Sequence, residues 1–389
     1  YEDKLDIAEK LLNELYAIEP NNEEIYIQKA NICSKRDQHE KAVELLKIAL
    51  QYTDDYADVY NLIGMEYLFM DNLEMAKDSF IKCLEEDLED QSALYNVVYC
   101  FEFLDQNQEA IVYLNEYINK NPYSEIAWHQ LGRLHYGVKE YENAIRAFDY
   151  ATLIDDEFLG AFMEKAKAYE RLKKYHEAIE SYNRTIELDD ATSYALLRIG
   201  KCYEKLGNLV KALQYYNQTV HEDPLLDKGW IAITDFHMRQ KNFQKALFFV
   251  NKALAIDNQN RLYWKRYATI NKQMNFFEEA EFGYRKAVEF GDYALDTWLF
   301  WVDILQFLGE FDSAIQTLLQ ATEYFPEENE IEYRLAGLYF MTQDTTKAKF
   351  HLSNGLRLNF DNYILIEDLF PVVWSKKTVK NYIEKHRKQ

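Results

Sequence analysis

The hydrophobic and polar positions along this chain repeat with a constant spacing of 34 residues. An alanine stands at every step, and no insertion or deletion interrupts the series Ala8, Ala42, Ala76, Ala110, Ala144, Ala178, Ala212, Ala246, Ala280, Ala314 and Ala348. Four of the five prolines follow the same spacing, since Pro20, Pro122, Pro224 and Pro326 are each three units apart. A fixed period of this length predicts a protein built from stacked structural repeats.

Each unit contains two helical faces when its repeated alanine is numbered as position 20. Position 4 is aromatic or leucine in all units but one, where Glu332 stands, and position 8 is small except at Val98 and Val302. Positions 4, 8 and 11 fall on one face of a helix, and positions 20, 24 and 27 fall on one face of a second helix. The pattern predicts two antiparallel helices with a turn near positions 15 to 17, as at Gly207 and Gly309. Small residues at positions 8 and 20 would let the two backbones approach, and large ones at positions 4, 11 and 24 would fill the surrounding space.

These positions carry a resemblance to a known family. The residues Trp128, Leu131, Gly132, Ala144, Phe148 and Ala151 resemble the consensus of the tetratricopeptide repeat position by position. The unit that contains Leu196, Ile199, Gly200, Tyr203, Ala212, Tyr216 and Pro224 is similar to it in the same way. The resemblance covers residues 3 to 362. It implies an all-α fold, a right-handed α–α superhelix of about eleven helix-turn-helix repeats, whose concave face is lined by the first helix of each pair.

The period divides the chain into three parts. Residues 1–22 are expected to supply only the second helix of a truncated first repeat, residues 23–362 ten complete repeats, and residues 363–389 a C-terminal capping segment. A polar-faced capping helix would protect the apolar end of the array, and a separate binding tail is the alternative. Because the chain begins at Tyr1 without a methionine, we expect a fragment, which a targeting region or a further domain could precede.

Composition and charge narrow the class of protein. The chain has 44 basic and 66 acidic residues, a formal charge of −22, and this balance disfavours nucleic acid as a partner, because phosphate binding needs a cationic surface. It has no apolar run long enough to span a membrane. Four scattered cysteines without a CxxC pair disfavour a disulfide framework and a zinc site, and they favour a reducing compartment, which we expect to be the cytoplasm.

Motifs that carry catalytic chemistry are absent. The sequence contains no glycine-rich phosphate loop, no nucleophile elbow and no HExxH pair. His135 and His237 occupy position 11, where packing is expected, and the pairs Asp155-Asp156 and Asp189-Asp190 are expected to cap helices in the turns between repeats. The sequence therefore predicts a protein without enzymatic activity, metal or cofactor.

The predicted concave groove has an unusual charge. In the family this surface is built largely from positions 2, 5, 6 and 9 of the first helix, and in repeats five to nine only Glu164 and Asp235 oppose seven basic residues there: Arg133, Lys167, Arg198, Lys201, Lys228, Lys265 and Arg266. Tyr95, Tyr99, His129, Tyr194 and Phe300 complete the predicted peptide-binding groove, and Arg334 and Tyr333 extend it. Either these cations pair with acids on adjacent helices, or they form an electropositive channel that attracts an anionic segment. No three consecutive repeats hold the lysine, asparagine and arginine set of the family's carboxylate clamp.

The preferred hypothesis is a non-enzymatic scaffold or adaptor that binds partner peptides or proteins in this groove, with anionic or mixed acidic and apolar segments as ligands. The alternative is the substrate-recruiting arm of a larger enzyme or of a secretion or assembly complex whose active domain lies outside the chain. Nucleic-acid binding with tyrosines stacked on bases and self-association through the uncovered N-terminal half-repeat complete the set of hypotheses.

Overall fold

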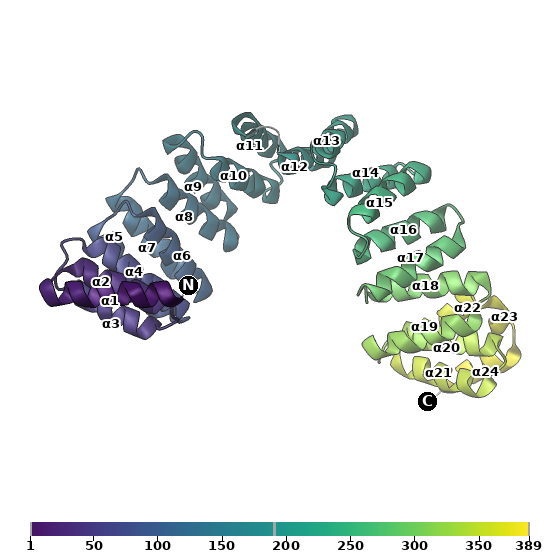
Figure 1. The fold of residues 1–389 in the computed structure, drawn as a ribbon. Coiled ribbons are helices and arrows are strands. Elements are labelled where there is room, and N and C mark those ends of the chain that lie inside the picture. Colours follow the sequence, from purple (N-terminus) through teal and green to yellow (C-terminus); the bar gives the residue numbers. More distant parts are fainter. Residues whose placement is uncertain (1, 190–191, 388–389) are drawn as a thin grey trace. The chain divides into compact units, whose positions relative to one another are not determined.

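The protein is an all-α helical repeat solenoid, as the sequence predicted. The computed structural model describes residues 2–189 and 192–387, and every regular element within those ranges is helical (Figure 1). The chain divides into two compact units, residues 1–207 and residues 208–389, called unit 1 and unit 2 below. Among the described residues no helix is both long enough and apolar enough to cross a membrane.

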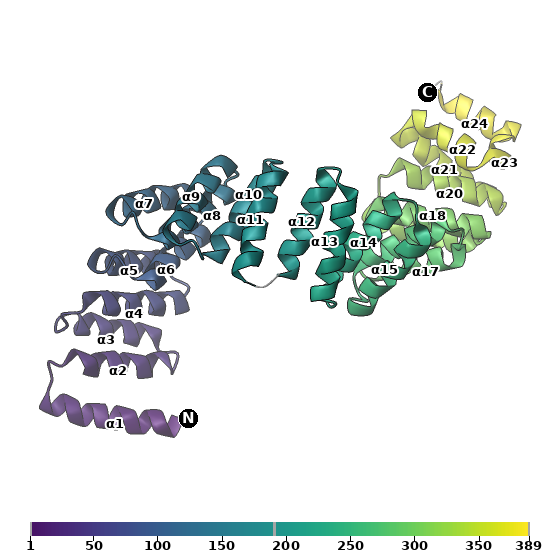
Figure 2. The ribbon, with the colours of Figure 1, turned by 90° about the horizontal axis from the view of Figure 1, so that it is seen from above.

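Unit 1 is a stack of helices in which each packs against the next one along the chain. Figure 2 shows α1, α2, α3 and α4 as successive layers. Its helices are α1 (Glu2–Ile18), α2 (Glu23–Ser34), α3 (His39–Ala49), α4 (Tyr56–Phe69), α5 (Leu73–Glu86), α6 (Gln91–Phe103), α7 (Asn107–Lys120), α8 (Glu125–Gly137), α9 (Tyr141–Ile154), α10 (Leu159–Arg171), α11 (Tyr175–Leu188) and α12 (Ser193–Lys205).

Unit 2 continues the alternation of first and second helices and then departs from it. The regular helices are α13 (Leu209–Glu222), α14 (Asp227–Arg239), α15 (Phe243–Ile256), α16 (Arg261–Gln273), α17 (Phe277–Glu289), α18 (Leu295–Leu308), α19 (Phe311–Tyr324), α20 (Asn329–Met341) and α21 (Thr345–Leu358). Shorter elements follow, namely the 3-10 turn η1 (Phe360–Tyr363), α22 (Ile364–Leu369), α23 (Pro371–Trp374) and α24 (Lys377–Arg387).

The turn inside every pair has the same backbone conformation. The residue at position 15 has a positive φ in each of the ten helix pairs, with values from 55° to 78°. These residues are Asp37, Asp71, Asp105, Lys139, Lys173, Gly207, Lys241, Asn275, Gly309 and Gln343. A left-handed residue just after a helix lets the chain reverse while the last carbonyls keep hydrogen-bond partners. Two of the ten residues are glycines and four are aspartate or asparagine, which adopt this conformation readily, whereas at the remaining four, three lysines and a glutamine, it costs roughly 1 kcal/mol or more.

Small residues at position 8 set how closely the two helices of a pair approach. A Cβ atom added to Gly132 would lie 2.5 Å from a ring carbon of Phe148 at position 24, and one added to Gly64 would lie 2.6 Å from Phe80. Where valine stands at position 8 instead, as at Val98, the paired helices α6 and α7 pack less closely than the pairs with a small residue there. The sequence pattern therefore reports backbone distance as well as burial.

The periodic prolines and the aromatic residues at position 4 are joined by hydrogen bonds. The indole Nε1 of Trp128 donates to the carbonyl of Pro122 at 3.0 Å, and that of Trp230 donates to Pro224 at 2.9 Å. Tyr26 makes the same contact through its hydroxyl to Pro20. Each bond fixes the start of a first helix to the turn that precedes it.

The segment of residues 360–374, called the C-terminal segment below, packs against first helices of unit 2. Phe370 lies directly over Gly337 of α20, where a Cβ atom would collide with its ring, and the side chain of Gln306 on α18 donates to the carbonyl of Leu369 at 3.2 Å. Ile366 and Val373 have no exposed surface. The segment therefore covers α20, beside which Figure 1 shows α22 and α23, and reaches α18.

Candidate functional site

The predicted groove residues lie on the first helices of the pairs, which are α2, α4, α6, α8, α10 and α12 in unit 1 and α14, α16, α18 and α20 in unit 2. We call the surface that these helices form within one unit its first-helix surface. Residues 95–201 of the predicted set belong to unit 1 and residues 228–300 belong to unit 2.

Aromatic rings form a stripe along α6. Tyr95 and Tyr99 are 42% and 43% exposed, and Phe103, one further turn along, is 66% exposed. The rings of Tyr99 and Phe103 lie with their centroids 4.4 Å apart. Because residues four apart share one side of a helix, the three rings form one continuous surface, which we call the α6 stripe. Phe103 stands at position 13, outside positions 2, 5, 6 and 9, from which the groove was predicted. Its spacing of four residues from Tyr99 is the sequence signal that would have identified it.

A pocket of about 280 Å³ lies beside this stripe, between α6, α8 and α10. We call it the α8–α10 pocket; its lining residues are Glu102, Arg133, Tyr136, Gly137, Glu164 and Lys167. The hydroxyl of Tyr136 accepts a hydrogen bond from Arg171 at 3.0 Å, which fixes one wall. The structure thus brings together Arg133 and Lys167, two of the predicted groove cations.

The two cations of the pocket are not fully neutralised. The Nη1 atom of Arg133 donates to the side-chain oxygen of Gln130 at 2.7 Å, while Glu102 lies 3.7 Å from its Nη2 atom, beyond normal hydrogen-bond length. Lys167 has no carboxylate oxygen within 4.0 Å in the part of the chain that the structure describes, and its Nζ atom lies 5.9 Å from the centre of the Tyr194 ring. Both side chains can therefore accept another anion.

Glu164, the acidic residue of the pocket, is held against a buried histidine. Burial by itself would raise the pKa of Glu164, but His129, Arg133 and Lys167 together lower the pKa below its ordinary value, so the carboxylate is ionised at neutral pH. Its Oε2 atom lies 3.5 Å from Nε2 of His129, and neither ring nitrogen of that histidine has a hydrogen-bond partner in the described chain. His129 is 9% exposed and packs on Phe158, so a ligand in the pocket would meet Glu164 rather than this predicted groove residue.

Arg198 on α12 belongs to an internal ion pair. Its Nε and Nη2 atoms donate to the two oxygens of Glu170 at 2.9 and 2.5 Å, and the buried hydroxyl of Tyr182 donates to the same carboxylate at 2.7 Å. Burial first, and then the charge of Glu170, raise the pKa of Tyr182, so this hydroxyl keeps its proton. The predicted neighbours Tyr194 and Lys201 lie on the same helix, where Tyr194 is 42% exposed and Lys201 is half-buried.

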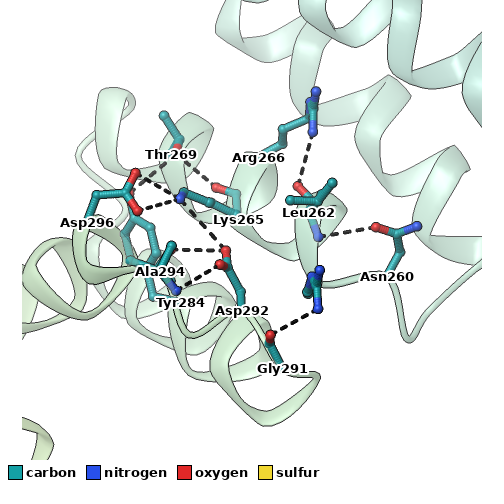
Figure 3. Close-up of polar contacts among 12 residues, drawn as sticks. Asn260, Leu262, Lys265, Arg266, Thr269, Tyr284, Gly291, Asp292, Ala294 and Asp296 are labelled. Carbon is teal, nitrogen blue, oxygen red and sulfur yellow. Dashed lines mark hydrogen bonds and ion pairs between the residues drawn. The ribbon is translucent and has the colours of Figure 1, made fainter. Parts of the chain in front are cut away.

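In unit 2 two of the predicted cations are also paired. Lys265 reaches both oxygens of Asp296 at 2.9 Å and Asp292 at 3.8 Å, and Figure 3 shows these carboxylates converging on its Nζ atom. Arg266 forms a bidentate ion pair with Asp235, in which its Nε and Nη2 atoms donate to the two carboxylate oxygens at 2.7 and 3.0 Å. These contacts join consecutive first helices, so the interpretation that the cations pair with neighbouring acids describes both residues.

The remaining predicted residues of unit 2 differ in exposure. Lys228 is exposed, with no carboxylate within 4.0 Å among the residues described, and Phe300 is 38% exposed. Arg334 is 6% exposed and paired with Asp303, while Tyr333 is fully buried, with its hydroxyl donating to the carbonyl of Asn359. The Tyr333 ring lies against Gly355 of α21, so this predicted groove residue packs against the second helix of its own pair.

The ion pairs have a spacing that the sequence analysis did not use. Asp235 and Arg266, Asp303 and Arg334, and Lys265 and Asp296 are each 31 residues apart. That step joins one first helix to the next with the offset of about one helical turn that side-by-side helices require. Counting charges within one repeat could not reveal it, because each partner lies in the neighbouring repeat.

The turn aspartates are partly described. Asp155 accepts a hydrogen bond from the backbone amide of Glu157 at 3.0 Å, and α10 has no side-chain cap, so Asp155 stabilises the turn instead of capping the next helix. Asp190 lies outside the described residues. The predicted packing residue His237 is buried and stacked on Phe249.

Comparison with protein families gives matches to four models, each described as a tetratricopeptide repeat. One model matches residues 2–65, a second residues 57–90, a third residues 92–124, and a fourth residues 129–190, 163–226 and 301–348. Together they cover nearly all of unit 1 and, in unit 2, residues 208–226 and 301–348.

Curated and solved relatives are distant. Anaphase-promoting complex subunit 3 of Schizosaccharomyces pombe is 24% identical over 157 residues, which are 40% of this chain and 24% of that protein. A tetratricopeptide repeat protein of Parabacteroides merdae is 14% identical, with 63% of this chain and 97% of that one covered and a TM-score of 0.47. YrrB, described as a tetratricopeptide repeat protein with an unusual peptide-binding site, is 23% identical, with 48% and 95% covered and a TM-score of 0.36. The four models, all of the same repeat, together match more than half of the chain, and the chain belongs to the tetratricopeptide repeat family.

Proposed function

We propose that this protein is a non-enzymatic interaction scaffold that binds segments of partner proteins on its first-helix surface, with anionic or mixed acidic and apolar segments as ligands. The observation that carries the proposal is the α8–α10 pocket, in which Lys167 has no described carboxylate partner and Arg133 is only loosely held. The exposed α6 stripe adjoins it. Members of this family bind protein or peptide partners, which supports the general assignment.

We propose that this surface lies mainly in unit 1, and the ion pairs of the other cations support the choice. Arg198, Lys265 and Arg266 each hold a carboxylate of the chain, so their charge is used within the fold. Lys228 is the exposed cation of unit 2 that could contribute to binding. We also propose that residues 1–22, 23–362 and 363–389 act as the half-repeat, the repeat array and the cap.

An accessory role in a larger assembly is the alternative function. The curated relative is a subunit of a complex, and this chain spans 24% of its length. In that case the first-helix surface would recruit a substrate or subunit for an activity located elsewhere. The site would be the same, and the bound partner would distinguish the two functions.

Self-association is a further candidate interaction, because α1 leaves apolar side chains uncovered. Ile7, Leu11, Leu15 and Ile18 are 61%, 55%, 50% and 75% exposed. Light scattering across a concentration series, with Leu11→Ser and Leu15→Ser as the test variant, would show a loss of mass if α1 joins two copies. For the compartment we propose the cytoplasm, which the four free cysteines support.

Site-specific photo-crosslinking tests the scaffold function. A photo-reactive amino acid is placed at Phe103 in the α6 stripe and, as a matched control, at Leu153 on the second helix α9, which is 79% exposed. We expect crosslinked polypeptides at position 103 and few at position 153 when the protein is irradiated in its own cells. Equal crosslinking at both positions would refute the proposed surface.

A further inference from the structure

We propose that the α6 stripe and the α8–α10 pocket bind one partner segment together, in which an aromatic or long aliphatic side chain stands about two to four residues from an acidic one. The apolar side chain packs on Tyr99 and Phe103, and the carboxylate enters the pocket between Arg133 and Lys167. This inference rests on the proposed function, since it requires that the first-helix surface of unit 1 binds a peptide segment.

The α6 stripe supplies the apolar half of the site. Its three rings are 42%, 43% and 66% exposed, and they follow one another at every fourth residue of α6. A flat surface of adjacent rings contacts a large apolar side chain over much of its area, and stacked aromatic contacts add about 0.5–1.5 kcal/mol to the burial itself. The hydroxyls of Tyr95 and Tyr99 can stay in water at the edge of the contact.

The α8–α10 pocket supplies the acidic half. Glu102 lies 3.7 Å from Nη2 of Arg133, too far for a normal hydrogen bond, so this nitrogen can donate to an incoming oxygen. The Nζ atom of Lys167 has no described carboxylate within 4.0 Å and can donate to the other oxygen. Gly137 lines the same pocket, and a Cβ atom there would meet nothing within 4 Å, so the wall is open.

The spacing of the two halves follows from Glu102, a pocket residue on the same helix as the stripe. Glu102 lines the pocket and stands beside Phe103 and one turn from Tyr99 on α6. A helical turn of about 5.4 Å plus the 3.7 Å between Glu102 and Arg133 puts the rings roughly 9 Å from the cations. An extended peptide advances about 3.3 Å per residue, which gives the separation of about two to four residues.

Repulsion by nearby aspartates disfavours an acidic residue of the partner segment on one side of the stripe. Asp55, Asp58, Asp87 and Asp90 stand in or next to α4 and α6, and the nearby Asp55, then burial, and then Asp90 and Asp87 raise the pKa of Asp58. An acidic residue on that side of the stripe would add to the same repulsion, whereas on the α10 side it meets Lys167. The carboxylates of Glu102 and Glu164 also disfavour a polyanion such as a nucleic acid, which would bring several phosphates to two cations.

Selection from a random peptide library displayed on phage tests the inference, with the full chain immobilised. The variants are Lys167→Gln and Phe103→Ser; the matched controls are Lys120→Gln on α7, an exposed lysine, and Leu153→Ser on α9. Circular dichroism confirms that each variant stays helical. We expect the wild type and both controls to enrich peptides with the paired acidic and apolar residues.

Calorimetry on the best peptide then measures each half of the site. Lys167→Gln is expected to weaken binding about tenfold, the effect of one charge-assisted hydrogen bond, and this loss should vanish for a peptide whose acidic residue is replaced by its amide. Peptides that bind Lys167→Gln as tightly as the wild type would overturn the inference and leave the proposed function standing. Enriched peptides that lack an acid would overturn both the inference and the proposed acidic ligand, and would leave only the scaffold function. A library that yields no peptide on any version of the protein would refute the proposed function itself.

Discussion

Because Gly132 lies against Phe148, adding a methyl group at residue 132 should lower the stability of the protein. A Cβ atom at residue 132 would lie 2.5, 2.6 and 2.9 Å from three carbons of the Phe148 ring, which has no exposed surface. Carbon atoms pack best about 3.5–4.0 Å apart, so α8 and α9 would have to separate by roughly 1 Å. The ring cannot turn away, because it is enclosed by Ala144, Ala151 and the next pair of helices.

The magnitude follows from two opposing effects. Overfilling a packed core costs about 1–3 kcal/mol, whereas glycine to alanine within a helix gains up to about 1 kcal/mol. Gly137 on the same helix isolates the second effect, because its added Cβ atom would meet nothing within 4 Å. The variant Gly132→Ala should therefore be less stable than Gly137→Ala by about 1–3 kcal/mol, with the propensity gain present in both.

Hydrogen exchange measured by mass spectrometry is the suitable assay, because repeat arrays need not unfold in one step. We expect faster exchange of the amides of α8 and α9 in Gly132→Ala than in Gly137→Ala. Adding Phe148→Leu should recover part of the loss, since the smaller side chain makes room for the methyl group. If Gly132→Ala proves as stable as Gly137→Ala, position 8 does not set the helix separation and the packing argument fails.

Three further predictions concern the turns and the buried polar groups. Replacing Lys241, which has a φ of 55°, by glycine should raise stability by about 0.5–1 kcal/mol, measured as a higher melting temperature; a lower one would contradict the strain argument. Removing Arg198 by Arg198→Ala leaves the partly buried Glu170 without its cation, although Tyr182 still donates to it, and should cost about 2–3 kcal/mol in chemical denaturation, whereas a neutral result would show that the pair contributes nothing. Burial first, and then Lys245, lower the pKa of His237, so the unfolded chain takes up a proton that the folded chain excludes, and stability falls as the pH drops below about 6.5. The variant His237→Gln should lose this pH dependence in melting experiments between pH 7.5 and 5.5, and parallel curves for the two proteins would contradict it.

Much of the fold could be predicted from the sequence because its information is local and repeated. The pairing of helices follows from the apolar spacing, and the small residue at position 8 faces the large one at position 24, as Gly132 and Phe148 show. The turn at position 15 was also predicted, but its left-handed conformation at residues such as Lys241 was not, since lysine gives no signal for it. Phe103 was missed because it stands one turn beyond the positions considered.

The charged surface was less predictable for a physical reason. An ion pair depends on a few ångströms between atoms of different helices, so whether Arg198 or Lys167 keeps a free charge depends on how neighbouring repeats pack. From the sequence both residues were predicted as equivalent groove cations. In the structure Arg198 pairs with Glu170, whereas Lys167 lines the α8–α10 pocket and has no described carboxylate oxygen within 4.0 Å.

The sequence by itself determined the family, the period and the helix pairs. The reason is that the apolar spacing that forms a helix pair lies within each 34-residue repeat and recurs in the next one. Only the tertiary structure decided which predicted groove residues are accessible. It buried Tyr333 against Gly355 of α21 and His129 among aromatic rings, and it left the α6 stripe and the α8–α10 pocket exposed. The physical reason is that exposure and pairing are properties of the contact between repeats, which no single repeat contains.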